Sequence, residues 1–158
     1  MVTLIAPPGL KNLKGIQPAM EPNPPLGLAY IAGTLKGNGI DYHVIDGAGE
    51  ALDQIKIFKH QSLREDSDFY IQGLSIEEIV ERIPENSEIV AISCLFSINW
   101  LCTKELARQI RQKFPESILV IGGEHSSACP EYCLINSVLW LFSTPPGTIA
   151  LTRIFGAK

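Results

Sequence analysis

The chain has 158 residues and a formal net charge of -4, with 46% hydrophobic and 19% charged residues, which fits one ordinary globular domain. No cluster of Lys and Arg is available to neutralise phosphates, so we expect no nucleic-acid partner. The apolar runs are too short to cross a bilayer and no basic region follows Met1, so we expect a cytoplasmic protein without a membrane partner.

The N-terminal segment predicts a strand, a long connection and a helix. Val2 to Ala6 is a short aliphatic run, typical of a buried strand, and the prolines and glycine that follow stop it. Residues 9–24 show no apolar period. From Pro25 onward a helical stripe recurs at i, i+3, i+4 and i+7, formed by Leu28, Ile31, Ala32 and Leu35.

A second strand and a second helix follow. Tyr42 to Ile45 predicts the strand, which ends in a loop of Asp, Gly and Ala. Residues 51–73 are mixed and charged, and we expect a helix remnant and an irregular excursion there. Ser75 and Glu78 form a capping box, because the serine can accept from the first turn and the glutamate can return the bond.

The third part of the chain repeats the alternation. Glu88 to Leu95 predicts a strand that is buried on both faces, and Trp100 to Phe114 predicts a helix. Ile118 to Ile121 predicts a further strand, which ends at Gly122 and Gly123. Val138 to Phe142 is the candidate fifth strand. Strands that alternate with helices at short spacing predict the α/β class, a doubly wound, flavodoxin-like or Rossmann-like parallel sheet flanked by helices.

In open α/β sheets ligands bind at the carboxyl ends of the strands, near the point where the strand order reverses. That rule selects the loops that follow the four predicted strands, at residues 7–9, 46–49, 94–97 and 122–127. Three of them are rich in Gly, Ser or Asp, which lets a ligand approach the backbone closely. Neither G-x-G-x-x-G after the first strand nor a P-loop is present, which argues against a nucleotide phosphate site.

The four cysteines do not form an iron–sulfur motif. Cys129 and Cys133 are four positions apart, but position 136, where a third cysteine would stand, holds Asn. We therefore expect no iron–sulfur cluster and no bound metal, with reduced thiols as the simplest interpretation of all four.

Several segments resemble the cobalamin-binding N-terminal domain of cobalamin-dependent radical S-adenosylmethionine enzymes. The most specific is the run Pro-Pro-Leu-Gly-Leu-Ala-Tyr at residues 24–30, followed by Tyr-His-Val-Ile-Asp at 42–46. Residues 92–97 and 121–125 add Ile-Ser-Cys-Leu-Phe-Ser and Ile-Gly-Gly-Glu-His.

The broader cobalamin-binding family has the pattern D-x-H-x-x-G, then S-x-L, then G-G. In this chain Asp46 matches the first element, Ser93 and Leu95 the second, and the glycine pair the third, at similar spacing. The resemblance implies a cofactor site formed by Asp46, Gly47, Ala48, Ser93, Cys94, Leu95, Phe96, Ser97, Gly122, Gly123, Glu124 and His125. It also implies that Gly122 and Gly123 leave room for the nucleotide tail of the cofactor.

This sequence departs from the family pattern at the cobalt ligand. Ala48 stands where the family has its ligating histidine, and Ala51 where it has the final glycine. The resemblance therefore implies cobalamin in a base-off state without a protein histidine ligand. His43 and His60 are expected to be structural or solvated rather than ligating.

The resemblance implies a longer protein in which a barrel with a three-cysteine cluster follows this domain. We expect residues 1–142 to form the cobalamin-binding domain and residues 143–158 a short atypical tail, so that the chain ends before the catalytic barrel. The expected function is a cobalamin-binding module that presents the corrinoid to a radical S-adenosylmethionine domain or chain, without catalytic residues of its own.

Three alternatives remain open. The chain could be one half of a split methyltransferase or cyclase made of two chains, or a degenerate fragment that folds and binds nothing. It could also be a generic flavodoxin-like domain with another ligand.

Overall fold

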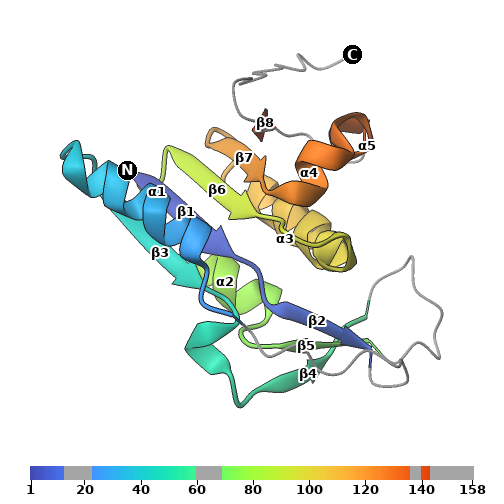
Figure 1. Ribbon diagram of the computed structural model, residues 1–158. Helices are drawn as coiled ribbons and strands as arrows, with labels where there is room; N and C mark the ends of the chain where they lie inside the picture. The colour runs from blue at the N-terminus through green and yellow to red at the C-terminus, as the bar shows by residue number, and fades with distance from the viewer. Residues whose placement is uncertain (13–22, 60–68, 136–139, 143–158) are drawn as a thin grey trace.

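A parallel sheet of five strands forms the centre of the molecule (Figure 1). The computed structural model describes residues 1–12, 23–59, 69–135 and 140–142. Every pair in the sheet is parallel. In spatial order the strands are β3 (Tyr42–Asp46), β1 (Val2–Ala6), β6 (Ile89–Ser93), β7 (Ile118–Gly122) and β8 (Trp140–Phe142).

Helices cover both faces of this sheet, which confirms the predicted α/β class. On one face α1 (Leu26–Gly37) lies over β1 and β3, where Leu28 and Ala32 pack against Leu4 (Figure 1). The other face carries the main core, to which α2 (Ile76–Arg82) and α3 (Trp100–Lys113) contribute. Ile31, expected on the inner side of α1, is 48% exposed instead.

Helix α2 begins as predicted. Its N-cap Ser75 accepts from the backbone N–H of Glu78, and the Glu78 carboxylate accepts from the backbone N–H of Ser75. This capping box satisfies two N–H groups that a helix terminus leaves without an intrahelical partner. Ile76, Ile79 and Val80 are then buried on the side of the helix that faces the core.

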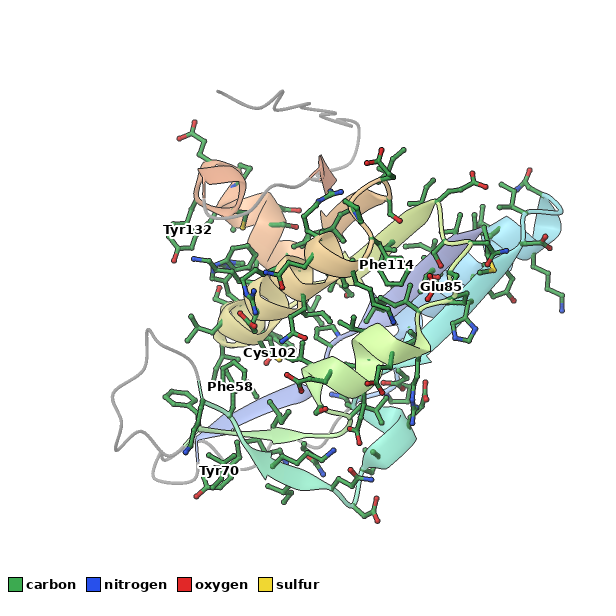
Figure 2. All side chains as sticks on the ribbon, turned by 180° about the vertical axis from the view of Figure 1, so that it is seen from behind. Phe58, Tyr70, Glu85, Cys102, Phe114 and Tyr132 are labelled. Carbon is green, nitrogen blue, oxygen red and sulfur yellow. The ribbon has the colours of Figure 1, made fainter. Side chains whose placement is uncertain are left out.

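The prediction for residues 51–73 was wrong. A second, antiparallel sheet of three strands stands there beyond the carboxyl ends of β1 and β3 (Figure 1). Its strands are β2 (Gly9–Asn12), β5 (Phe69–Gln72) and β4 (Ile55–Ile57). A short 3-10 turn, η1 (Gly49–Ala51), leads into it. Figure 2 shows Tyr70 on this small sheet and Phe58 directly after β4.

Two short helices follow β7 where the sequence predicted a loop at residues 122–127. They are α4 (Glu124–Ala128) and α5 (Pro130–Ile135), and they lie beside β7 and β8 (Figure 1). The predicted fifth strand is present as β8, although positions 138 and 139 lie outside the described residues. Among the helices that the structure describes, none has the length and apolar character to span a membrane.

Candidate functional site

The loops chosen from the sequence meet at one edge, because all strands of the central sheet run in the same direction. The pairing register places Ala6 beside Asp46 and Ser93 beside Gly122 at the carboxyl ends. The strand order reverses between β1 and β6, since the chain passes from β1 outward to β3 and then returns to β6. The loops after β1 and β6 therefore flank the position where open α/β sheets bind ligands.

The β6 and β7 loops are joined by backbone contacts. The N–H of Cys94 donates to the carbonyl of Gly122 at 2.6 Å, directly beyond the last residues of the two strands. Gly123 has φ of +117°, and a Cβ built there would lie 2.7 Å from the carbonyl carbon of Cys94. The second glycine of the pair is therefore needed by the protein itself, whether or not a ligand approaches it.

Large apolar side chains are exposed on the β6 loop. Leu95 is 49% exposed, Phe96 43% and Ile98 39%. These three side chains lie within four positions of one another, and contiguous exposed apolar patches mark binding sites. This segment leads through η2 (Ser97–Asn99) into α3, and the Asn99 side chain accepts from the backbone N–H of Leu10 at 3.3 Å. The apolar patch thus lies beside the switch point between β1 and β6.

His125 connects α4 to the β6 loop. Its backbone N–H donates to the carbonyl of Cys94 at 3.3 Å, and its Nδ1 is 2.9 Å from Oγ of Ser97. The ring is 7% exposed and lies against Trp100, with centroids 5.0 Å apart. Burial lowers the pKa of His125, so the neutral imidazole is favoured at physiological pH. Glu124, the first residue of α4, is exposed.

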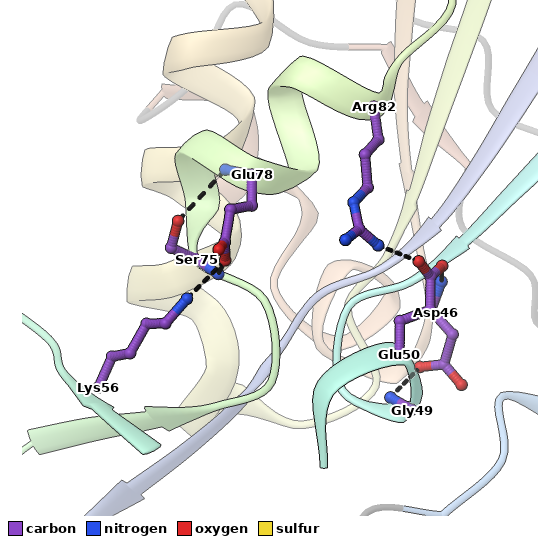
Figure 3. A network of polar contacts seen from close by, with 7 residues as sticks. All are labelled: Asp46, Gly49, Glu50, Lys56, Ser75, Glu78 and Arg82. Atoms are coloured by element: carbon purple, nitrogen blue, oxygen red, sulfur yellow. Dashed lines mark hydrogen bonds and ion pairs between the residues drawn. The ribbon is translucent and has the colours of Figure 1, made fainter. Parts of the chain in front are cut away.

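The loop at Asp46 belongs to a different part of the edge, because β1 separates β3 from β6. The Asp46 carboxylate accepts from the backbone N–H of Gly49 at 2.9 Å (Figure 3). Gly47 and Ala48 are buried beneath Gly73, where an added Cβ would lie 2.8 Å from Cα of Ala48. The structure therefore gathers the predicted residues of β6 and β7 and leaves those at 46–48 apart from them.

Charged side chains stabilise the Asp46 loop from outside. Glu50 accepts from the backbone N–H of Asp46 at 3.0 Å and pairs with Arg82 of α2 (Figure 3). Lys56 of β4 pairs with Glu78 at 2.6 Å, which fixes the small sheet to the same helix. This hydrogen bond, together with the Ser75 N–H, lowers the pKa of Glu78. These contacts account for the loop geometry without a ligand.

The remaining described side chains that could ligate a metal do not lie together. Burial raises the pKa of Cys102 to about 12 and that of Cys133 to about 11, while Cys129 is exposed. Among the residues that the structure describes, no three His, Cys, Asp or Glu side chains are grouped as a metal site would require. His43 is exposed on β3, and His60 lies outside the described residues.

Sequence reasoning missed Trp100 and Asn99 as parts of this site. Trp100 carries the ring against which His125 packs, and Asn99 links η2 to β2. Their only sequence signal is that both follow directly after the exposed apolar segment. The pairing of Ser97 with His125 joins positions 28 residues apart and depends on the β6–β7 register.

Comparison with known proteins identifies the family of the chain. Over 111 residues the chain is 32% identical to cytidylyl-2-hydroxyethylphosphonate methyltransferase of Streptomyces wedmorensis, a match that covers 70% of this chain and 20% of the relative. The chain thus spans about a fifth of the length of that relative. No solved structure matches the chain. The B12 binding domain family matches residues 19–140, most of the sheet included. The chain therefore belongs to the family of B12-binding domains, and its ligand is cobalamin.

Proposed function

We propose that this chain is a cobalamin-binding module that presents the corrinoid to a radical S-adenosylmethionine catalytic domain, located elsewhere in a longer protein or on a second chain. Family membership supports the cobalamin part. The observation that carries the site is the exposed apolar segment, Leu95, Phe96 and Ile98, at the switch point of the sheet.

The residues at this edge fit a corrinoid, which has a broad apolar ring with amide groups at its rim. Leu95 and Phe96 would supply apolar contact, and Ser93 would offer a hydroxyl to the base or ribose of the nucleotide tail. The full proposed set comprises Ser93, Cys94, Leu95, Phe96, Ser97, Gly122, Gly123, Glu124 and His125, with Asp46, Gly47 and Ala48 at the neighbouring loop.

When bound, cobalamin supplies a cobalt centre that can carry a transferable group. The protein residues would orient the cofactor and limit the access of water to it. No side chain of this chain is proposed to be catalytic.

We further propose that the cobalt is held base-off, without a ligating histidine and without an iron–sulfur cluster in this chain. Position 48 holds a buried alanine, whose methyl group has no lone pair for a metal. Electron paramagnetic resonance of the cobalt(II) form tests this. We expect no nitrogen superhyperfine splitting, and such a splitting would contradict the proposal.

The partner domain is proposed from two observations. The methyltransferase relative is about five times longer than the aligned segment, so most of that protein lies outside the part shared with this chain. The run at residues 24–30 resembles the cobalamin-binding domain of radical S-adenosylmethionine enzymes. We propose residues 1–142 as the binding domain and 143–158 as a separate tail.

Titration of the purified chain with hydroxocobalamin, followed by absorbance, tests the binding function. We expect one cobalamin per chain and a rise in melting temperature, because a ligand at about one hundred times its Kd adds roughly 2.7 kcal/mol to stability. A folded chain that binds no cobalamin would favour the degenerate-fragment alternative. Anaerobic mixing with a candidate catalytic chain, followed by size-exclusion chromatography, tests the partner.

A further inference from the structure

His125 contacts both ends of the segment that carries the exposed apolar side chains. Its backbone N–H donates to the carbonyl of Cys94 at the start of the segment. Its ring Nδ1 is 2.9 Å from the hydroxyl of Ser97 at the end. Leu95 and Phe96 lie between these two contacts.

The ring of His125 is itself fixed. It is 7% exposed, and Trp100 lies against it at an interplanar angle of 44°. Helix α4 holds its backbone, because the carbonyl of His125 accepts from the N–H of Cys129 at 3.0 Å. Trp100 belongs to α3 and His125 to α4, so Ser97 is bonded to a ring that two helices keep in place.

The two ring nitrogens have different environments. Nδ1 faces the Ser97 hydroxyl, whereas Nε2 is buried and has no hydrogen-bond partner within the described part of the chain. An Nε2 atom without exposed surface cannot reach a cofactor that lies over the edge of the sheet. The hydrogen-bonding function of this ring toward the site is therefore restricted to Nδ1.

The segment needs such a restraint because its side chains are in an unfavourable position. Leu95 and Phe96 are close to half exposed, and burial of apolar surface is the dominant force on a free loop. A loop without its restraint at Ser97 could fold these side chains back onto the sheet. The hydrogen bond between His125 and Ser97 restrains the end of this segment.

We propose that His125 is a positioning residue of the cobalamin site: through Nδ1 and Ser97 it holds the 94–97 segment so that Leu95 and Phe96 face the corrinoid, and its Nε2 contacts neither cofactor nor cobalt. This inference rests on the proposed function of the site. It assigns Ser97 and His125 a role in shaping the site rather than in ligating the cofactor.

Two substitutions distinguish the nitrogens. In His125→Asn the amide lies close to the place of Nδ1, since both are bonded to Cγ, while in His125→Gln the amide lies closer to the place of Nε2. Ser97→Ala removes the hydroxyl at an exposed position, where we expect little effect on folding. Each variant is titrated with hydroxocobalamin by absorbance, and backbone hydrogen exchange at residues 94–97 is measured in the free protein.

We expect His125→Asn to bind cobalamin within about threefold of wild type, and His125→Gln and Ser97→Ala to bind about five- to tenfold more weakly, the effect of one lost hydrogen bond. Exchange at residues 94–97 should increase in the two weak variants alone. The double variant Ser97→Ala, His125→Gln should be no weaker than either single one, because both remove the same contact.

In the opposite pattern, His125→Gln would bind cobalamin like wild type and His125→Asn would bind it weakly. That result would mean that Nε2 touches the cofactor and would overturn the proposal. Equal binding by all variants would overturn it as well. Failure of the wild-type chain to bind cobalamin would contradict the proposed function, and the role of His125 toward a cofactor would fall with it. The exchange data on the free protein would then still show whether Ser97 and His125 hold the segment.

Discussion

The backbone of Cys94 occupies the space that a side chain on Gly123 would need. The carbonyl carbon of Cys94 is 2.7 Å from an ideal Cβ at Gly123, and the glycine has φ of +117°. The two loops at the carboxyl ends of β6 and β7 can therefore approach each other only because position 123 lacks a side chain. The second glycine of the pair therefore has a structural reason within this chain.

Replacing Gly123 by alanine should strongly destabilise the fold. The backbone conformation alone costs on the order of 1–3 kcal/mol for a residue with a Cβ, and the contact with Cys94 adds to this. Gly33→Ala is the matched control, because an added Cβ meets nothing within 4 Å in the exposed middle of α1. It should stabilise by about 0.5–1 kcal/mol. Equal urea midpoints for Gly123→Ala and wild type would contradict this interpretation.

Loss of the capping box should weaken α2 and the small sheet attached to it. Ser75→Ala removes the acceptor for the N–H of Glu78 and should cost about 0.5–2 kcal/mol in the free energy of unfolding. Ser75→Asp, which retains an acceptor oxygen, should lie close to wild type. Chemical denaturation of the three proteins decides this, and a Ser75→Asp variant as unstable as Ser75→Ala would contradict the cap.

His125 should make stability fall in mildly acidic solution. Burial lowers its pKa below the 6.5 of a free imidazole, so the unfolded chain takes up a proton that the folded chain does not. The free energy of unfolding therefore decreases as the pH drops through 6.5 toward the lowered pKa. His125→Asn cannot titrate and should lack this decrease, and identical pH profiles of the two proteins between pH 7 and the lowered pKa would disprove the assignment.

Thiol labelling should distinguish the exposed cysteine from the three buried ones. Cys129 is exposed, whereas Cys94, Cys102 and Cys133 are buried. Burial also raises the pKa of each of these three thiols, and the thiolate is the reactive form. Iodoacetamide at mildly alkaline pH should modify Cys129 first, with the others protected until the chain unfolds. Fast labelling of Cys102, located by peptide mass spectrometry, would show that the core around α3 opens readily.

The sequence predicted the central layers because their signals are local. The aliphatic run at residues 2–6 matches β1, and Ser75 with Glu78 marks the start of α2. The small sheet was missed because its strands have three or four residues and pair positions as distant as Gly9 and Gln72. No periodic pattern can develop over so few positions.

The site was only partly predictable for a related reason. The sequence predicts Ser93 and the glycine pair at the carboxyl edge, since Ser93 lies near the end of one predicted strand and the glycine pair directly follows another. It could not show that β1 separates Asp46 from the β6 and β7 loops, because the order of β3 and β1 in the sheet depends on the crossovers. It could not pair Ser97 with His125, because that contact arises from the register of β6 and β7.

The central claim is that cobalamin lies over the carboxyl ends of β6 and β7. Hydrogen exchange of the whole chain, with and without saturating hydroxocobalamin, tests it most directly. We expect slower exchange at residues 94–99 and 122–128 in the complex. The opposite edge, at residues 84–88 and 114–117, should change little. Protection confined to that opposite edge, or none at the two loops despite bound cobalamin, would contradict this location of the site.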